Sequence, residues 1–301
     1  MKQAHPIVAV IMSTYNGARF LVEQIESVLA QRDVQVRLYV RDDGSTDETL
    51  QILEGFEREG RLTLERGENM GVVPSFIRAL SMVPSDIEFI ALCDQDDVWH
   101  RDKLARAVRE LSKRGQDVPL LYCSEYMFCD SDMQPLGRSH LNRIGVNFET
   151  LLYETMVSGN TTVINRRLAE LAIAAGSEGV YGHDWWLGLI AAGLGELIFD
   201  DFVSLDYRRT GGTVSPTGAS PVTLLLYRVR KFLAGGDLVK ITGQLQRYYQ
   251  CFGGNLPEGR RGLIERFLQG GRLRKALAPV RLRQKPLEEV ALRVLFLTGA
   301  I

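Results

Sequence analysis

The chain has 301 residues, of which 45% are hydrophobic and 24% are charged, and this balance argues against a disordered or fibrous protein. No stretch approaches the roughly 18 uninterrupted apolar residues of a membrane-spanning helix, and no secretory leader is expected. The four cysteines form no CxxC pair. They indicate reduced thiols, neither a disulfide framework nor a zinc site, so we expect a cytoplasmic protein.

The net charge of −1 conceals two regions of opposite sign. Residues 221–301 contain 15 Lys and Arg against 5 Asp and Glu, which leaves 21 basic and 32 acidic residues in 1–220. Opposite signs suggest two different tasks. We therefore predict one domain over 1–218 and a basic helical C-terminal region over 219–301.

The first hundred residues alternate between two patterns. Strands are predicted over the largely apolar segments 7–12, 36–40 and 87–92 and over the short segment 61–65, and apolar residues at helical spacing separate them. Ser45 or Thr46 is expected to cap the second helix. Strands that alternate with helices at this spacing predict an α/β fold with a mostly parallel, Rossmann-like sheet flanked by helices.

The pattern becomes less regular beyond residue 100. It predicts a helix over 102–113, strands over 119–123, 158–164 and 202–207, and an apolar helix that opens at 182–186. From about residue 220 the periodicity is helical and basic, interrupted only by glycine pairs. A helical C-terminal extension is therefore expected.

Three carboxylates, Asp94, Asp96 and Asp97, follow the fourth predicted strand. Carboxylates this close repel one another unless a cation neutralises them, and hard oxygen ligands suit Mg²⁺ or Mn²⁺. A solvated acidic turn explains the cluster alone equally well, because Asp-rich turns are common.

Polar residues also end the first two predicted strands. Thr14, Tyr15 and Asn16 follow the first strand, and Asp43 follows the second. The carboxyl ends of parallel strands meet at one edge of a sheet, so these groups can converge on the acidic cluster. These groups together suit the binding of a nucleotide diphosphate. Tyr15 offers an aromatic ring for stacking, Asp43 offers a carboxylate to the base or the ribose, and the acidic cluster offers a cation site. The chain has no glycine-rich phosphate loop, which favours a metal held by Asp.

Three motifs in this order resemble glycosyltransferase family 2: VIMSTYN at 10–16, RDDGSTD at 41–47 and CDQDDVW at 93–99. The resemblance covers about 6–215 and implies a GT-A fold and inverting transfer from a nucleotide-diphospho-sugar. The third motif, with HDWW at 183–186 and YRR at 207–209, is most similar to bacterial rhamnosyltransferases. That similarity implies dTDP-rhamnose as donor and a glycan or polyprenyl-diphosphate-linked acceptor in surface-polysaccharide assembly.

The resemblance also implies residue roles on the donor side. Thr14, Tyr15 and Asn16 would bind the nucleotide sugar, with Tyr15 stacked on the base. Asp43 would receive the imide N–H of the base. Asp96 would be the direct ligand of Mg²⁺ or Mn²⁺, with Asp94 nearer the ribose or sugar.

The remaining implied roles concern catalysis and the acceptor. Asp184 lies where the family places its catalytic base, with His183 and Trp185 on the acceptor side; core packing is the alternative for the tryptophans. Many relatives have a His shortly after the matching Arg, but this chain has Thr210. Arg208 or Arg209 is therefore expected to supply positive charge to the diphosphate.

Several alternatives remain open at this point. A family 2 enzyme that uses a UDP- or GDP-sugar fits the same motifs. A nucleotidyltransferase fits less well, because it normally has a glycine-rich basic loop near the N-terminus. A nucleic-acid-binding role is disfavoured, because the first 220 residues are acidic and the tail has few interleaved aromatics.

The C-terminal region has two competing explanations. Its segments 224–233 and 290–297 mix apolar and cationic residues at helical spacing. Basic amphipathic helices favour an anionic membrane surface, here the inner face of the plasma membrane. Helices that pack against the domain or form a homo-oligomer explain the pattern equally well.

Overall fold

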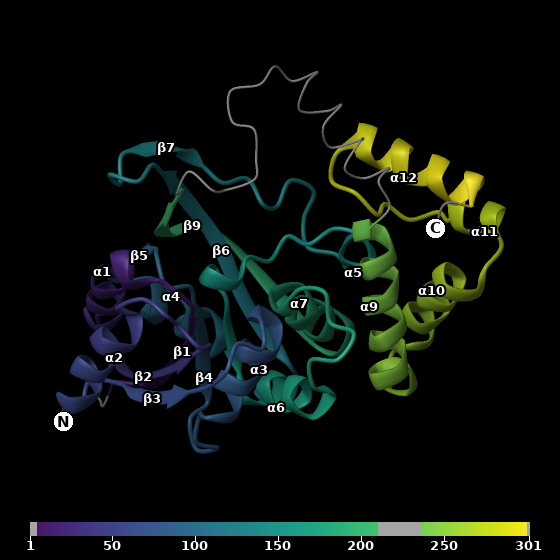
Figure 1. The fold of residues 1–301 in the computed structure, drawn as a ribbon. Helices are drawn as coiled ribbons and strands as arrows, with labels where there is room; N and C mark the ends of the chain where they lie inside the picture. Colours follow the sequence, from purple (N-terminus) through teal and green to yellow (C-terminus); the bar gives the residue numbers. More distant parts are fainter. Residues whose placement is uncertain (1–4, 210–235, 300–301) are drawn as a thin grey trace.

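A computed structural model describes residues 5–209 and 236–299 (Figure 1). The expected domain boundary near 218, the amphipathic segment 224–233 and Thr210 lie outside these ranges. Within them, no helix is long and apolar enough to cross a membrane.

One sheet organises the described part of the chain. Its order is β3-β2-β1-β4-β8-β6-β9-β5, with β7 paired to β6. Neighbours among β1 to β4 are parallel, as are β6 and β9, whereas β8 and β5 run antiparallel to their neighbours. The predicted mostly parallel α/β fold is therefore confirmed. The strands are β1 (Ile7–Thr14), β2 (Gln35–Asp42), β3 (Thr63–Arg66), β4 (Phe89–Cys93), β5 (Val98–Trp99), β6 (Leu120–Cys129), β7 (Pro135–Arg138), β8 (Val163–Asn165) and β9 (Glu196–Arg208).

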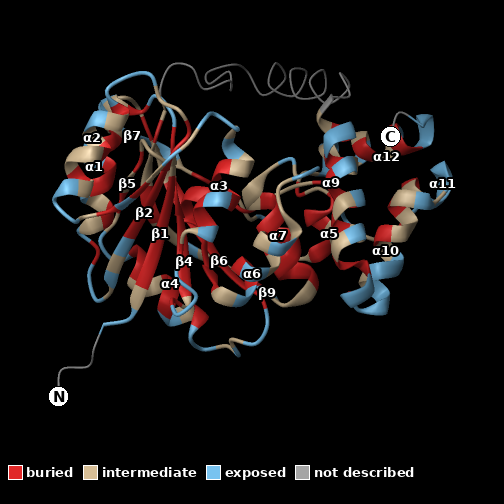
Figure 2. Ribbon diagram, turned by 60° about the horizontal axis from the view of Figure 1, so that its bottom comes forward, coloured by how far each residue is buried: buried red, intermediate tan, exposed pale blue. Residues whose placement is uncertain are grey.

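Helices cover both faces of this sheet (Figure 2). In β1, Val8, Val10 and Met12 pack toward α1, α2 and α4, whereas Ala9 and Ile11 pack toward α3, α6 and α7. Strands buried on both faces are continuously apolar, which explains the uninterrupted runs in the sequence. The helices are α1 (Ala18–Leu29), α2 (Thr49–Arg58), α3 (Val72–Ser81), α4 (Lys103–Leu111), α5 (Phe148–Leu151), α6 (Arg166–Ala175), α7 (His183–Leu194), α9 (Gly236–Phe252), α10 (Glu258–Gln269), α11 (Arg272–Ala276) and α12 (Pro286–Thr298).

Three local predictions differ from the structure. The strand predicted over 158–164 is wrong in its first half, because Gly159–Thr161 form a 3-10 helix and β8 begins at Val163. The predicted cap of α2 is wrong, because the helix begins at Thr49 and its N-cap residue is Glu48. Ser45 donates to the carboxylate of Asp42 at 2.6 Å, and Thr46 donates its backbone N–H to Asn16 at 2.8 Å. The last predicted strand is much longer than its apolar run, since β9 also pairs with β6 from Glu196 onward.

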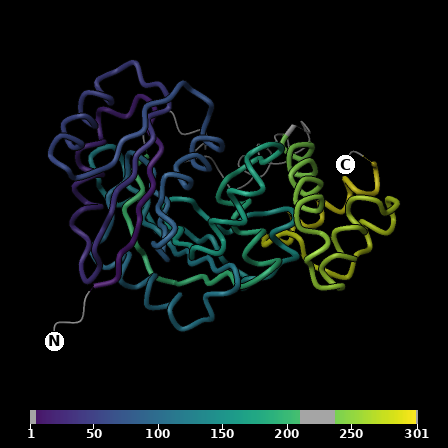
Figure 3. The backbone as a smooth tube through the Cα atoms, turned by 90° about the horizontal axis from the view of Figure 1, so that it is seen from below, coloured from purple at the N-terminus to yellow at the C-terminus, as the bar shows by residue number. Residues whose placement is uncertain are grey.

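The C-terminal helices pack directly against the sheet domain. α9 lies beside α7 and α5, with α10 to α12 beyond it (Figures 1 and 3). The indole of Trp186 in α7 contacts Tyr248 and Phe252 of α9, with both ring-centroid separations at 5.9 Å. One hydrophobic cluster runs from β1 and β4 through α7 into α9, α10 and α12, so the two regions share a core.

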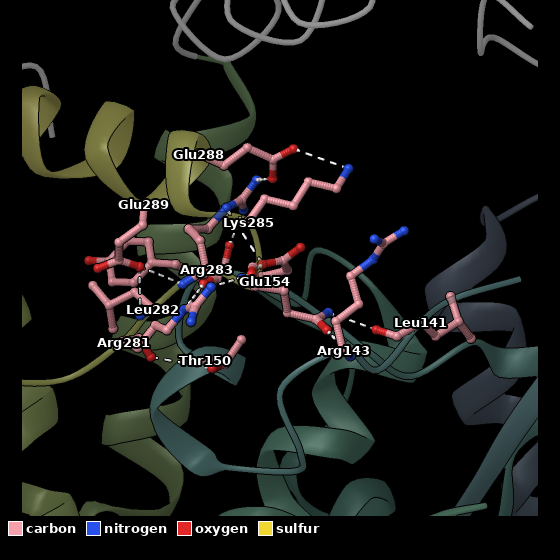
Figure 4. A network of polar contacts seen from close by, with 12 residues as sticks. Leu141, Arg143, Thr150, Glu154, Arg281, Leu282, Arg283, Lys285, Glu288 and Glu289 are labelled. Atoms are coloured by element: carbon pink, nitrogen blue, oxygen red, sulfur yellow. Dashed lines mark hydrogen bonds and ion pairs between the residues drawn. The ribbon is translucent and has the colours of Figure 1, made fainter. Parts of the chain in front are cut away.

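The segment between α11 and α12 adds polar contacts to this packing (Figure 4). The backbone N–H of Gln284 donates to Glu154 at 2.6 Å, and Arg283 donates to the carbonyl of Tyr153 at 2.7 Å. Thr150 of α5 donates to the carbonyl of Arg281 at 3.3 Å. The end of the chain therefore fixes the 150–154 segment of the first region.

Candidate functional site

The predicted donor-side residues converge at the carboxyl edge of the sheet. Thr14 at the end of β1 is in register with Asp42 of β2, and Met12 is in register with Cys93 of β4. The loops after these three strands therefore emerge side by side. β9 is parallel to β6 and ends at the same edge with Arg208.

Tyr15 is held by its backbone and exposes its ring. Its N–H donates to Oε1 of Gln95 at 2.9 Å, and Nε2 of Gln95 donates back to its carbonyl at 3.1 Å. Tyr15 as a whole is 47% exposed. A side chain at Gly17 would overlap the amide of Gln95 and would have to displace it from Tyr15. The arrangement leaves an aromatic face free for stacking.

Thr14 and Asn16 shape the loops on either side of Tyr15. Thr14 is buried, and its hydroxyl donates to Asp42 at 3.0 Å. Asn16 has φ +48, in the left-handed region, and its backbone N–H donates to Ser45 at 3.0 Å. Their polar groups therefore bind protein, and nucleotide contact by either residue stays a prediction.

Asp43 is also engaged by the protein. Its carboxylate is almost fully buried, forms an ion pair with Arg41, and accepts the backbone N–H groups of Met70 and Gly71 at 3.0 Å each. These bonds fold the 68–71 loop over the end of β2. A base contact by Asp43 would add to this set of bonds and remains a prediction.

Asp94 and Asp96 follow β4 at the centre of the edge. Burial raises the pKa of Asp94 to about 7, and the charges of Asp96 and Asp184 add to the rise. Burial also raises the pKa of Asp96, and the charge of Arg208 opposes it. Asp94 thus experiences the charges of two other carboxylates, one on its own loop and one on α7. Carboxylates that share a site in this way favour a cation.

Asp97 lies beneath this pair in a buried network. It accepts the side-chain N–H of Asn160 at 2.7 Å and the backbone N–H of Arg208 at 3.4 Å. Lys103, which is fully buried, donates to the carbonyl of Asn160 and lies 4.2 Å from the ring centre of Trp99. Burial lowers the pKa of Lys103 to about 7, and nearby acidic groups oppose that change. The network places a buried lysine beneath the acidic cluster.

Sequence reasoning missed Lys103, Asn160 and Gln95. The helix predicted over 102–113 has Lys103 outside its apolar face, and Asn160 lies within the strand predicted over 158–164. For two of them, the sequence position was the only indication of a role in the site. Gln95 lies within the acidic motif, and Lys103 follows that motif by one short turn. Neither fact indicates which groups these side chains bind.

Asp184 lies in the first turn of α7 and faces the acidic cluster closely enough to raise the pKa of Asp94. Its Oδ1 accepts the backbone N–H of Trp185 at 2.7 Å, which fixes the carboxylate at the helix start. The neighbouring His183 stacks on Phe76 of α3 with ring centroids 4.1 Å apart. Burial lowers the pKa of His183, and the charge of Asp184 opposes that change.

Trp185 is 6% exposed, and its indole N–H donates to the carbonyl of Leu151 at 2.5 Å. Both His183 and Trp185 thus use their rings for packing in this structure. An acceptor contact by either residue stays a prediction.

The two candidate arginines differ. Arg208 is buried, forms an ion pair with Glu23, and donates to the carbonyls of Asp96 at 3.1 Å and Ser131 at 2.8 Å. These bonds tie β9 to the acidic loop and commit the guanidinium to the protein. Arg209 lies over the ring of Phe128, 3.9 Å from its centre. Arg209 is therefore the less committed of the two, and a phosphate contact by either residue stays a prediction.

Among the described residues, no group of three or more His, Cys, Asp and Glu forms a metal site. A magnesium-like ion needs only one or two protein carboxylates when a substrate diphosphate and waters complete its shell. Asp96, with Asp94 beside it, offers such a pair of oxygen donors. Both carry a pKa raised by burial, so a cation would relieve the cost of their charges. The residues present fit a divalent cation.

A mostly parallel sheet, flanked by helices and with an exposed tyrosine and clustered carboxylates at its carboxyl edge, defines the class: a GT-A glycosyltransferase fold. The chain belongs to Glycosyl transferase family 2, whose profile matches residues 9–170. The predicted family and fold are confirmed.

Three similar proteins are a sequence relative and two solved structures. The dTDP-rhamnosyl transferase RfbG of Shigella flexneri is 33% identical over 108 residues, which are 32% of this chain and 35% of that protein. Residues 1–349 of S. aureus TarS, solved with UDP-GlcNAc, align with a TM-score of 0.54 at 17% identity, over 97% of this chain and 92% of that one. The mannosyltransferase PcManGT of Pyrobaculum calidifontis, solved with GDP-Man and Mn²⁺, aligns with a TM-score of 0.54 at 17% identity, over 99% and 76%.

Proposed function

We propose that this protein is an inverting glycosyltransferase that moves a sugar from a nucleoside-diphosphate donor to an acceptor hydroxyl. The observation that carries the proposal is the meeting of Tyr15, the Asp94–Asp96 pair and Asp184 at one sheet edge. Each supplies one requirement of the reaction: a stacking surface, a site for cation and diphosphate, and a base. The two known structures described above hold nucleotide sugars, UDP-GlcNAc and GDP-Man, which supports a donor of this class.

Inversion requires a single displacement at the anomeric carbon. Asp184 takes the proton of the acceptor hydroxyl as its oxygen bonds to that carbon, while the bond to the diphosphate breaks on the opposite face. The products are the inverted glycoside, the nucleoside diphosphate and a protonated Asp184. The bond from Trp185 N–H to Asp184 Oδ1 fixes the base and leaves Oδ2 for the acceptor.

We assign the binding of the donor and of the cation to residues at the same carboxyl edge of the sheet. We assign the base of the nucleotide to Tyr15 and Asp43, with Thr14 and Asn16 lining that pocket, and the sugar side to Asp94. Asp96 would hold Mg²⁺ or Mn²⁺, which stabilises the negative charge of the leaving diphosphate. Of the two arginines, Arg209 is the preferred source of positive charge for the diphosphate, and Arg208 is the second candidate.

dTDP-rhamnose is the proposed donor and a glycan or polyprenyl-diphosphate-linked sugar the proposed acceptor, in surface-polysaccharide assembly. The likeness to RfbG supports the donor. A thermal-shift panel of dTDP-, UDP- and GDP-sugars with Mn²⁺ or Mg²⁺ tests it. The expected result is the largest stabilisation by dTDP-rhamnose; a larger shift with a UDP- or GDP-sugar would overturn the donor and leave the family chemistry intact.

The roles of two aspartates can be tested separately. Asp184→Asn should retain donor-induced stabilisation but transfer sugar about 100- to 10,000-fold more slowly, which is the usual contribution of a general base. Asp96→Asn should lose both transfer and the cation-dependent part of the stabilisation. Asp86→Asn, an exposed carboxylate before β4, is the control and should behave like the wild type. Full transfer by both site variants would refute the mechanism.

We further propose that α12 brings the protein to an anionic membrane surface, on the inner face of the plasma membrane. Leu287, Val290, Val294 and Leu297 repeat at three- and four-residue spacing and are 65%, 60%, 50% and 45% exposed. An aliphatic stripe on one helix face is typical of interfacial helices.

Flotation with phosphatidylglycerol vesicles should be lost in a Val290→Glu/Val294→Glu variant and kept in Val239→Glu, an equally exposed valine on α9. Unchanged flotation of the α12 variant would exclude the membrane. A change in oligomeric state of that variant would instead favour homo-oligomerisation through this helix.

A further inference from the structure

The chain that leads into Asp184 lies on a helix from the opposite end of the sequence. Residues 179–182 form the short connection before α7, and they lie along α9. Two hydrogen bonds link the two segments: Gln244 Oε1 accepts the backbone N–H of Tyr181 at 2.8 Å and that of Gly182 at 3.2 Å. One side-chain oxygen therefore holds two consecutive backbone amides immediately before the proposed base.

The environment of Gln244 makes this contact specific. The side chain is 1% exposed, so water does not replace it as an acceptor. Two turns earlier on the same face of α9, Asp237 accepts the hydroxyl of Tyr181 at 3.1 Å. Residues seven apart lie on one side of a helix, so α9 binds both the backbone and the side chain of Tyr181.

In the described part of the chain, the N-cap of α7 makes no side-chain capping bond of its own. This residue, Gly182, has no side chain with which to cap the helix. Glycine is also the most flexible residue at such a position. Gln244 therefore restrains the two residues that precede the first turn, where Asp184 lies.

α9 is itself held firmly against α7. The ring of Tyr248 is fully buried against Trp186, and Gly193 leaves the space that its hydroxyl end occupies. Figure 3 shows the two helices side by side. α9 and α7 are therefore fixed relative to each other. A shift of the 181–182 backbone along α9 would change the position at which the chain enters α7, the helix that carries Asp184.

We propose that Gln244 is a positioning residue of the transfer reaction, which places the Asp184 carboxylate through the backbone of Tyr181 and Gly182. This inference rests on the proposed function, because Asp184 is the base only there. It gives the C-terminal region a role in the chemistry of the sheet domain. Tyr15 and Asp96 lie on other loops, so the role is separate from donor binding.

Gln244→Leu keeps the volume but removes the acceptor, whereas Gln244→Glu keeps an acceptor oxygen. Gln246→Leu, an exposed residue of the same helix, is the matched control. A misplacement of about 1 Å can cost about 100-fold in rate, so Gln244→Leu should lower the turnover number about 10- to 100-fold. Turnover is measured as dTDP release from dTDP-rhamnose with Mn²⁺ and water as the acceptor hydroxyl, and the Kd of dTDP should stay within about twofold.

Hydrogen exchange of the peptide over 178–186 gives a readout that does not depend on activity. Gln244→Leu should exchange faster there, with Gln244→Glu and Gln246→Leu close to the wild type. Unchanged exchange in Gln244→Leu, or faster exchange with full turnover, would overturn the proposal, as would equal losses in Gln244→Glu and Gln244→Leu. A wild type that releases no dTDP would instead refute the proposed donor, while the exchange result still decides whether Gln244 holds this segment.

Discussion

Replacing Asp94 by asparagine should make the protein more stable and less active. In the folded chain, burial and the charges of Asp96 and Asp184 raise the pKa of this carboxyl from the ordinary 3.8 to about 7. The ionised form is thus disfavoured by folding. The stabilising effect of the raised pKa is fully present below pH 3.8 and is lost as the pH rises through 7.

The difference between 3.8 and about 7 corresponds to about 4 kcal/mol at 1.36 kcal/mol per tenfold change in proton affinity. That figure is a ceiling, because the side chain keeps partial contact with water, which screens its charge. Asparagine has nearly the same shape and no charge. We therefore expect Asp94→Asn to gain about 1–2 kcal/mol at pH 8 and about half of that or less at pH 5, where the carboxyl is ionised in the unfolded chain but still protonated in the folded one.

Thermal melts in EDTA at pH 5 and pH 8 measure this gain, with the exposed Asp86→Asn as control. At about 2–4 °C per kcal/mol, the midpoint of Asp94→Asn should rise by roughly 2–8 °C at pH 8. Mn²⁺ with dTDP should narrow the gap, because a cation relieves the same repulsion in the wild type. The reasoning would be refuted if Asp94→Asn melted below the wild type at pH 8. It would also be refuted if the difference between the two midpoints were the same at pH 5 and pH 8.

Three further predictions concern the residues around this cluster. Tyr15→Ala should weaken dTDP binding about 10-fold by calorimetry, because stacking on a base contributes about 1–3 kcal/mol, while Tyr15→Phe should bind normally. Gly17→Ala should weaken the same binding by displacing the amide of Gln95, whereas Gly55→Ala, which meets no atom within 4 Å, should not; equal affinities would contradict the close contact. Arg208→Ala should lower the free energy of unfolding by about 1–3 kcal/mol in urea titrations, since it leaves the carbonyls of Asp96 and Ser131 without their donor; an unchanged midpoint would show that this arginine does not tie β9 to the acidic loop.

The first four strands and the acidic edge could be predicted from sequence because both are local patterns. The run before Asp94 is apolar throughout because β4 is buried on both faces, and the polar residues begin where the sheet ends. β5 has only two residues and no pattern of its own, and it exists because Val98 and Trp99 pair with β9. Such a strand is defined by a partner about a hundred residues away.

The interior of the site could not be predicted for a similar reason. Lys103 has the sequence context of a surface residue, but the packing of α4 against β8 and β9 places it under the acidic cluster. Gln244 lies in a region with opposite charge, and nothing local connects it with Asp184. Contacts of this kind depend on the relative placement of distant elements, which hydrophobic periodicity does not specify.

The basic charge of the C-terminal region has a structural use that its net charge does not reveal. Three of its arginines bind carbonyl oxygens in the last turns of helices: Arg247 at the end of α6, Arg260 at the end of α7 and Arg293 at the end of α11, with N–O distances of 2.8, 2.9 and 3.1 Å. Last-turn carbonyls lack partners within their own helix, and a cation there also complements the helix dipole. Two of these contacts join the C-terminal region to the sheet domain. Loss of one of these arginines would therefore disturb the fold and any lipid contact together, so the aliphatic face of α12 is the proper place to test membrane binding.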